Sequence, residues 1–249
     1  MRKNAFSLVE LLAVVAIILI LMSLIFPFWG SLRLKSTRLA DMSNMRNFAS
    51  ACVASATDSD GFLPVGERES SVNRVQGDDL VWNNSGEMYR IMTNYMNDRR
   101  MFSCVGYHLN NGWKNYPASY GAVGSWGGFI GWTYLTRRRV DQSWPMVNKD
   151  GSLKGQNYVH LTRLSSDSTS RTLAGCMSWT GPVYNGNVAH TKRSEACISQ
   201  PTSGYPFYYA QDLAGSNIGY LDGSANWVDF RDLSVMKDVD FMLYDPRRR

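Results

Sequence analysis

The sequence is poor in charge and in the residues that build most catalytic and metal sites. Charged residues make up 19% of the 249-residue chain, which contains three histidines and four cysteines. His108, His160 and His190 show no metal-ligand spacing, and no two cysteines form a Cys-x-x-Cys pair. The Gly-x-Ser-x-Gly nucleophile motif, a phosphate-binding loop and the dinucleotide-binding fingerprint are also missing. The sequence therefore predicts neither a zinc site nor an enzyme. A pair of catalytic carboxylates of the glycosidase type is an alternative that these missing motifs do not exclude.

Positive and negative charges nearly balance over the body of the chain. Lys and Arg number 26 and Asp and Glu 21, a net charge of +5, and Arg2, Lys3 and residues 247–249 supply five positive charges at the two ends. The Arg run at 137–139 is typical of a solvated loop. This balance predicts no nucleic-acid partner. A hydrophobic content of 44% with eight tryptophans also excludes a disordered chain.

A long apolar run follows the short basic N-terminus. From residue 6 to residue 28 the chain is apolar apart from Ser7, Glu10 and Ser23, which is close to the length that spans a bilayer. Residues 22–27 offer no small-x-small cleavage site, so an ordinary secretory signal is not favoured. A carboxylate at Glu10 costs several kcal/mol in lipid unless it has a partner, so a plain anchor does not explain it.

Residues 5–12, Ala-Phe-Ser-Leu-Val-Glu-Leu-Leu, lie after the basic leader and before the long apolar helix. This run resembles the N-terminus of type IV prepilins and type II secretion pseudopilins. The resemblance implies cleavage by prepilin peptidase between Ala5 and Phe6 and methylation of the new N-terminus at Phe6. It also implies that Glu10 neutralises the N-terminal amine of a neighbouring subunit during assembly. The family usually has Gly before the cut, and Ala5 departs from this. Pro27 matches the place where many pilin helices kink.

The resemblance implies a structural subunit of a type IV pilus or of a type II secretion-like pseudopilus, assembled into a helical filament. The implied partners are prepilin peptidase, sister subunits, and a platform protein with its assembly ATPase. The mature protein would be held in the bacterial inner membrane by one helix, with its head in the periplasm, before assembly. The flanking charges Arg33, Lys35 and Arg38, against Arg2 and Lys3, favour the opposite orientation under the positive-inside rule.

The predicted fold is α+β, with a long N-terminal helix packed on a small antiparallel sheet that carries long loops. We expect a leader at residues 1–5, a transmembrane helix segment at 6–29, an amphipathic continuation at 30–57 and a globular head at 58–249. The amphipathic part is predicted from apolar residues at steps of three and four, namely Leu39, Met42, Met45, Ala49, Cys52 and Ala56. Turn-forming residues at 57–61 predict its end.

Asp222-Gly223, between two β-compatible runs, predicts a tight hairpin near the C-terminus. With a two-residue turn, Tyr220 would face Ala225 and Ile218 would face Trp227, with these four packed on the long helix. The hairpin resembles the C-terminal element of a pseudopilin-like group defined by a His, nine residues and Asp-Gly, but the His position here holds Asp212.

The hairpin region contains oxygen ligands of the kind that bind calcium. The oxygen ligands of Asp212, Asn217 and Asp222 are close in sequence, and some related pseudopilins bind calcium near this end. Capped turns explain the same residues without a metal, and the expectation is no cofactor.

Four cysteines, at positions 52, 104, 176 and 197, allow three disulfide pairings. An exported chain with an even cysteine count favours disulfides, and Cys176 with Cys197 could close a surface loop as in many pilins. Buried free thiols are the alternative, above all for Cys52 on the helix stripe.

Residues 102–134 are rich in Gly, Asn and aromatic side chains. Aromatic faces can stack on sugar rings, so a membrane-anchored surface module that binds carbohydrate is an alternative function. The simpler interpretation is that these side chains fill a core that a small sheet cannot cover alone.

Overall fold

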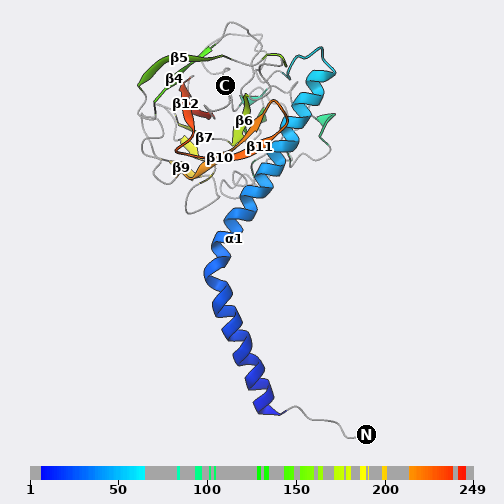
Figure 1. The fold of residues 1–249 in the computed structure, drawn as a ribbon, viewed down its shortest axis with the longest axis vertical. Coiled ribbons are helices and arrows are strands. Elements are labelled where there is room, and N and C mark those ends of the chain that lie inside the picture. Colours follow the sequence, from blue (N-terminus) through cyan, green and yellow to red (C-terminus); the bar gives the residue numbers. More distant parts are fainter. Residues whose placement is uncertain are drawn as a thin grey trace. The chain divides into compact units, whose positions relative to one another are not determined.

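A computed structural model of the chain describes residues 7–64, 83–84, 93–96, 101, 104, 128–129, 132–134, 143–148, 152–159, 162–164, 171–176, 178–180, 186–188, 190, 198–200, 213–237 and 241–244. The chain divides into two compact units, Met1–Thr37 and Arg38–Arg249. Helix α1, Leu8–Thr57, supplies residues to both units (Figure 1). The α+β fold predicted from the sequence is confirmed.

The strands of the described residues are β1 (Asn83–Asn84), β2 (Gly128–Phe129), β3 (Trp132–Tyr134), β4 (Ser143–Val147), β5 (Leu153–Val159), β6 (Thr172–Cys176), β7 (Ser178–Thr180), β8 (Gly186–Val188), β9 (Ile198–Gln200), β10 (Gly215–Tyr220), β11 (Ala225–Asp229), β12 (Ser234–Lys237) and β13 (Phe241–Tyr244). They pair antiparallel in three sheets, with orders β1-β2, β11-β10-β6-β3 and β5-β4-β12-β13-β7-β8-β9.

In the first unit, α1 runs from residue 8 to residue 37 and contains Pro27. The ring removes one backbone donor, yet the helical assignment continues on both sides of the proline. The kink expected at Pro27 stays a prediction. No residue of the most apolar stretch of α1 is buried, and the helix is long and apolar enough to cross a membrane by length and composition.

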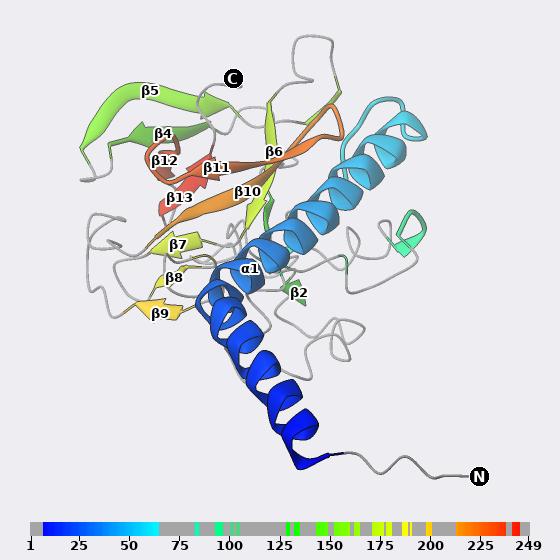
Figure 2. The same ribbon diagram turned by 60° about the horizontal axis from the view of Figure 1, so that its bottom comes forward.

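In the second unit, residues 38–57 of α1 pack with one face against the four-stranded sheet (Figure 2). The predicted stripe is confirmed at Met45, Ala49, Cys52 and Ala56, which are fully buried. It is wrong at Leu39, which is 59% exposed. The other buried helix residues are Asp41, Phe48, Ala51 and Ser55. The buried face therefore begins with a carboxylate rather than with a leucine.

The end of α1 agrees with the turn signal at 57–61. Asp60 and Gly61 have φ values of 52° and 86°, the left-handed region that glycine adopts without strain. The Gly61 N–H donates a 2.7 Å hydrogen bond to the carbonyl oxygen of Ala56, which satisfies a terminal carbonyl of the helix.

The hairpin between β10 and β11 forms, but its predicted register is wrong by one residue. Gly219, not Tyr220, is the partner of Ala225, and Ile218 is the partner of Asn226. Three residues, not two, form the loop, and Gly223 has a φ of 77° in it. A three-residue loop with a left-handed last residue is the next commonest hairpin connection after the two-residue turn.

The shift in register decides which side chains face the helix. Gly219 approaches Met45 and Ala49 of α1, and Leu221 and Ala225 belong to the same core. Ile218 and Tyr220 belong instead to a second core with Leu213, Val228, Leu233 and Val235. Strands β10 and β11 thus contribute to two hydrophobic cores, one of which includes α1.

Candidate functional site

The N-terminal end of α1 is capped by the side chains of Ser7 and Glu10. The Val9 N–H donates to Ser7 Oγ at 3.2 Å, and the Ser7 N–H donates to Glu10 Oε2 at 2.9 Å. The arrangement resembles a capping box, except that the Ser7 hydroxyl accepts from the second helical residue instead of the third, and it satisfies two backbone donors at the helix start. The predicted cleavage residues Ala5 and Phe6 lie outside the described residues. Glu10 therefore has a local structural partner in addition to its predicted part in assembly.

The surface that follows Glu10 is almost entirely apolar. The large hydrophobic side chains from Leu8 to Leu32 are between 45% and 75% exposed. Glu10 is the one acidic residue of the sequence between residues 7 and 37. A mostly apolar helix surface of this length is unfavourable in water, and it is suited to lipid or to contact with other apolar helices.

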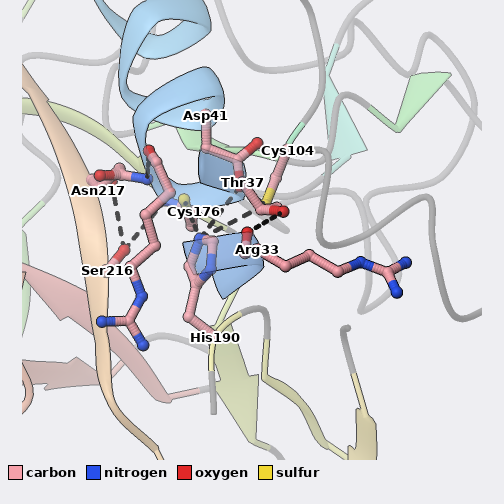
Figure 3. A network of polar contacts seen from close by, with 9 residues as sticks. Arg33, Thr37, Asp41, Cys104, Cys176, His190, Ser216 and Asn217 are labelled. Carbon is pink, nitrogen blue, oxygen red and sulfur yellow. Dashed lines mark hydrogen bonds and ion pairs between the residues drawn. The ribbon is translucent and has the colours of Figure 1, made fainter. Parts of the chain in front are cut away.

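A second polar group lies inside the second unit, where Asp41, Cys104, Cys176 and His190 meet (Figure 3). His190 Nε2 lies 3.0 Å from Cys176 Sγ, 3.6 Å from Cys104 Sγ and 3.6 Å from Asp41 Oδ2. The Cys104 thiol donates to Asp41 Oδ2 at 3.3 Å. Cys176 is 2% exposed and the other three residues are fully buried. We call these four residues the buried Cys-His-Asp cluster.

Each member of the cluster comes from a different part of the fold. Asp41 lies on α1 at the start of its buried face, and Cys176 is the last residue of β6. Cys104 and His190 lie outside the helices and strands. Burial is the largest cause that raises the pKa of the Cys104 thiol well above its usual range, followed by the neighbouring Cys176 and Asp41. As it stands, this thiol is a protonated donor.

The two ends of β10 and β11 support the cluster from one side. The Cys176 N–H donates to Ser216 Oγ at 3.1 Å, and the Ala214 N–H donates to the His190 carbonyl oxygen at 3.0 Å. The His190 ring meets the Trp227 ring edge-on, with centroids 5.3 Å apart. These contacts hold the backbones and rings around the cluster in place.

The cluster was not predicted from the sequence, because Asp41, Cys104 and His190 are far from one another in the chain. Asp41 and Cys104 are 63 residues apart, and Cys104 and His190 are 86 residues apart. One signal was available, namely that Asp41 interrupts an apolar helix face. Only the tertiary fold brings its partners to it.

The structure does not have the disulfide that was predicted between Cys176 and Cys197. Cys176 is a free thiol, because its side chain points from the end of β6 into the core toward His190. Cys197 lies outside the described residues. Cys52 and Cys104 are also buried and form no disulfide, as the alternative interpretation expected for Cys52.

The three calcium candidates are not brought together by any described contact. Asp222 is exposed, and its Oδ1 accepts a hydrogen bond from the Ser224 N–H in the hairpin loop. Asn217 is buried in β10 and its Nδ2 donates to the Arg38 carbonyl oxygen at 3.2 Å. Asp212 lies outside the described residues. Calcium binding stays a prediction.

Two of the aromatic side chains proposed for sugar stacking are part of the core. Trp132 is fully buried and Tyr134 is 1% exposed, with its hydroxyl donating to the Pro64 carbonyl oxygen at 2.8 Å. Tyr134 also meets Phe48 of α1 edge-on. The other aromatic residues of 102–134 lie outside the part of the chain whose side chains are described.

Comparison with known proteins bears on the N-terminal segment. Residues 1–26 match the family model described as the prokaryotic N-terminal methylation motif. No curated protein and no solved structure matches the chain. The matched residues include the basic leader, Phe6, Glu10 and most of the apolar run. The chain therefore carries at its N-terminus the methylation motif that is the signature of type IV prepilins and pseudopilins.

Proposed function

We propose that the protein is a structural subunit of a type IV pilus or a type II secretion-like pseudopilus, cut and methylated by prepilin peptidase and then assembled into a helical filament. The observation that carries this proposal is the methylation motif at residues 1–26 together with the exposed apolar helix that begins within it. Proteins with this motif are structural rather than enzymatic, and we propose the same here.

The apolar part of α1 needs an apolar environment before and after assembly. Burying a large aliphatic or aromatic side chain contributes about 1.5–3 kcal/mol, so residues 8–32 strongly favour lipid over water. In a filament the same side chains would be buried against the helices of neighbouring subunits. Contacts of one kind that repeat head to tail without closing are sufficient to make such a fibre.

Glu10 is the residue that we propose to set the register between subunits. A carboxylate among apolar helices is costly unless an opposite charge or donor reaches it. Cleavage before Phe6 would create a free amine close to the start of the helix, and the amine of an adjacent subunit is the partner that we propose. Within one subunit, the capping bond to the Ser7 N–H satisfies part of the carboxylate.

Substitutions at Glu10 separate these two roles. Glu10→Gln keeps an acceptor for the Ser7 N–H and removes the charge, whereas Glu10→Leu removes both. We expect both variants to accumulate in the membrane and to be cut after Ala5, and both to be depleted in fibres. The measurement is the ratio of membrane-held to sheared protein in cells that express a tagged chain, together with the intact mass of the mature protein.

The intact mass should show loss of residues 1–5 and gain of one methyl group in the wild type and in both variants. A mature chain that begins near Gly30 would mean ordinary signal cleavage and would contradict the proposal. Fibre entry that Glu10→Gln restores to the wild-type ratio would assign Glu10 to helix capping alone. An unchanged ratio for Glu10→Leu would remove Glu10 from assembly altogether.

A further inference from the structure

The buried Cys-His-Asp cluster has the composition and the burial of a structural metal centre. It offers two thiol sulfurs, one imidazole nitrogen and one carboxylate oxygen, and these are the donors from which proteins build four-coordinate zinc sites. The donor atoms of Cys104, Cys176 and His190 all lie within 4.8 Å of one another, and Asp41 Oδ2 contacts two of the three.

Three of the donor-to-donor contacts agree with a tetrahedron around a small ion. Metal–sulfur bonds of about 2.3 Å and metal–nitrogen or metal–oxygen bonds of about 2.0–2.1 Å place neighbouring ligands of a tetrahedral zinc about 3.3–3.8 Å apart. The contacts from His190 Nε2 to Asp41 and Cys104 are both 3.6 Å, and Cys104 to Asp41 is 3.3 Å. The 3.0 Å contact of His190 with Cys176 is shorter and would have to open by about 0.5 Å. Asp41 is not in the group of donors that lie within 4.8 Å of one another, so it would have to move toward Cys176 to complete the tetrahedron.

The burial of Asp41 gives a second, independent argument. Asp41 is at zero exposure, and a buried carboxylate is stabilised when it is hydrogen-bonded, paired with an opposite charge or bound to a metal ion. A divalent cation bound to the carboxylate and to two thiolates would be such a partner and would leave the cluster with one net negative charge. The Arg38 guanidinium lies 4.2 Å from the centre of the Trp227 ring, which itself contacts His190, so a positive charge is near.

We propose that Asp41, Cys104, Cys176 and His190 bind one Zn²⁺ ion in a closed structural site. Thiolate and imidazole donors favour zinc over calcium and magnesium, which prefer oxygen ligands. Because all four ligands are buried, the site offers no open position to a substrate. It would join α1 to β6 and to two segments that are distant in sequence. The site lies within residues 38–249 and does not depend on filament assembly.

The test uses the full-length protein in detergent, isolated without chelator and then exposed to Zn²⁺ or Co²⁺. We expect about one zinc per chain by elemental analysis. The cobalt-loaded protein should show a thiolate-to-cobalt charge-transfer band and the intense visible absorption of a tetrahedral site. The double variant Cys104→Ser/Cys176→Ser should lose both signals, with an affinity loss larger than the roughly 10–100-fold that substitutions beside metal ligands cause.

Cys52→Ser is the matched control, because Cys52 is a fully buried cysteine that forms no disulfide, lies on the same helix face and is not among the clustered donor atoms. This variant should keep the zinc and the cobalt spectrum. Wild-type protein that holds no zinc and gives no cobalt spectrum would overturn the proposal, without reference to any variant. A native disulfide between Cys104 and Cys176 in peptide mapping, or an unchanged cobalt spectrum in the double variant, would overturn it as well.

Discussion

The contact of Gly219 with Met45 allows a direct test of how the hairpin packs on the helix. A Cβ atom added at Gly219 would lie 2.9 Å from the Sδ atom and 3.0 Å from the Cγ atom of Met45, and 3.5 Å from the Ala49 Cβ. The backbone at Gly219 is not in the left-handed region, so alanine meets no conformational strain there. Gly219→Ala therefore changes packing against α1 and little else in the folded state.

The two contributions to stability oppose each other and differ in size. Overpacking of a filled core costs about 1–3 kcal/mol, whereas replacing glycine by alanine stabilises by about 0.4–1 kcal/mol through the unfolded chain. We expect Gly219→Ala to lower the free energy of unfolding by about 1–2 kcal/mol. Met45 is fully buried, and Met45→Ala should lower it by about 2–5 kcal/mol.

The double variant distinguishes direct packing from two independent effects. In Gly219→Ala/Met45→Ala the Sδ and Cγ atoms are gone, and the new methyl group fills part of the space that they leave. Its loss of stability should therefore be smaller than the sum of the single losses by about 1–3 kcal/mol. The assay is urea denaturation of the full chain in detergent, followed by tryptophan fluorescence.

Gly175→Ala on β6 is the control for this cycle. Its added Cβ would meet the Cδ1 atom of Ile218 at 2.9 Å, on β10, and no helix atom is among its nearest neighbours. Combined with Met45→Ala, its effect should add without coupling. Additive losses for Gly219→Ala with Met45→Ala, or a Gly219→Ala variant as stable as the wild type, would refute the packing of β10 on this part of α1.

Two further predictions concern tyrosines. Tyr134→Phe removes a buried 2.8 Å hydrogen bond to the Pro64 carbonyl oxygen and should lower the free energy of unfolding by about 1 kcal/mol in the same urea assay; an unchanged denaturation midpoint would contradict it. The Tyr95 hydroxyl donates to Asp58 Oδ2 at 2.9 Å, and this bond raises the pKa of Tyr95 above its usual value. Its contribution to stability is complete below the usual tyrosine pKa of about 10 and is lost as the pH rises through the higher folded-state pKa. Ultraviolet titration, read as the difference from Tyr95→Phe, should show that pKa fall in Asp58→Asn, and a value that does not move would rule out the bond.

The long helix and its end were predictable because local physics determines them. An unbroken apolar run and a cluster of turn formers act over a few residues, and the structure agrees with both in helix α1 and in the turn at residues 57–61.

The hairpin register and the start of the buried helix face needed information that is not local. Asp-Gly is compatible with both two-residue and three-residue loops, and the choice moves every side chain of β10 to the other face. Leu39 obeys the helical spacing of the stripe, but the face that packs on the sheet is centred on Met45 and Ala49 and includes Asp41 instead. Helical periodicity determines the spacing of the apolar residues along α1, but the surface that the helix packs against determines which face is buried.

The cluster was the least predictable feature, since metal-ligand motifs are recognisable in sequence only when the ligands lie close together. Here two ligands lie outside the helices and strands, and each is brought to Asp41 by the packing of other elements. An isolated Asp on an apolar helix face is nevertheless informative, because a carboxylate in that position requires either exposure to water or a polar partner.

The position of Asp41 ties the proposed metal site to the proposed role of the chain. Asp41 is the first buried residue of α1, and the helix residues that follow it pack in the core of the second unit. A subunit extracted from a membrane by its helix must keep the helix attached to the rest of its fold. Hydrophobic contacts at Met45 and Phe48 resist separation in proportion to the area they bury, whereas separation at Asp41 would also break a metal–ligand bond. Zinc bound at the first packed turn would therefore raise the cost of the earliest step in detaching α1, where fraying from the exposed half would otherwise begin.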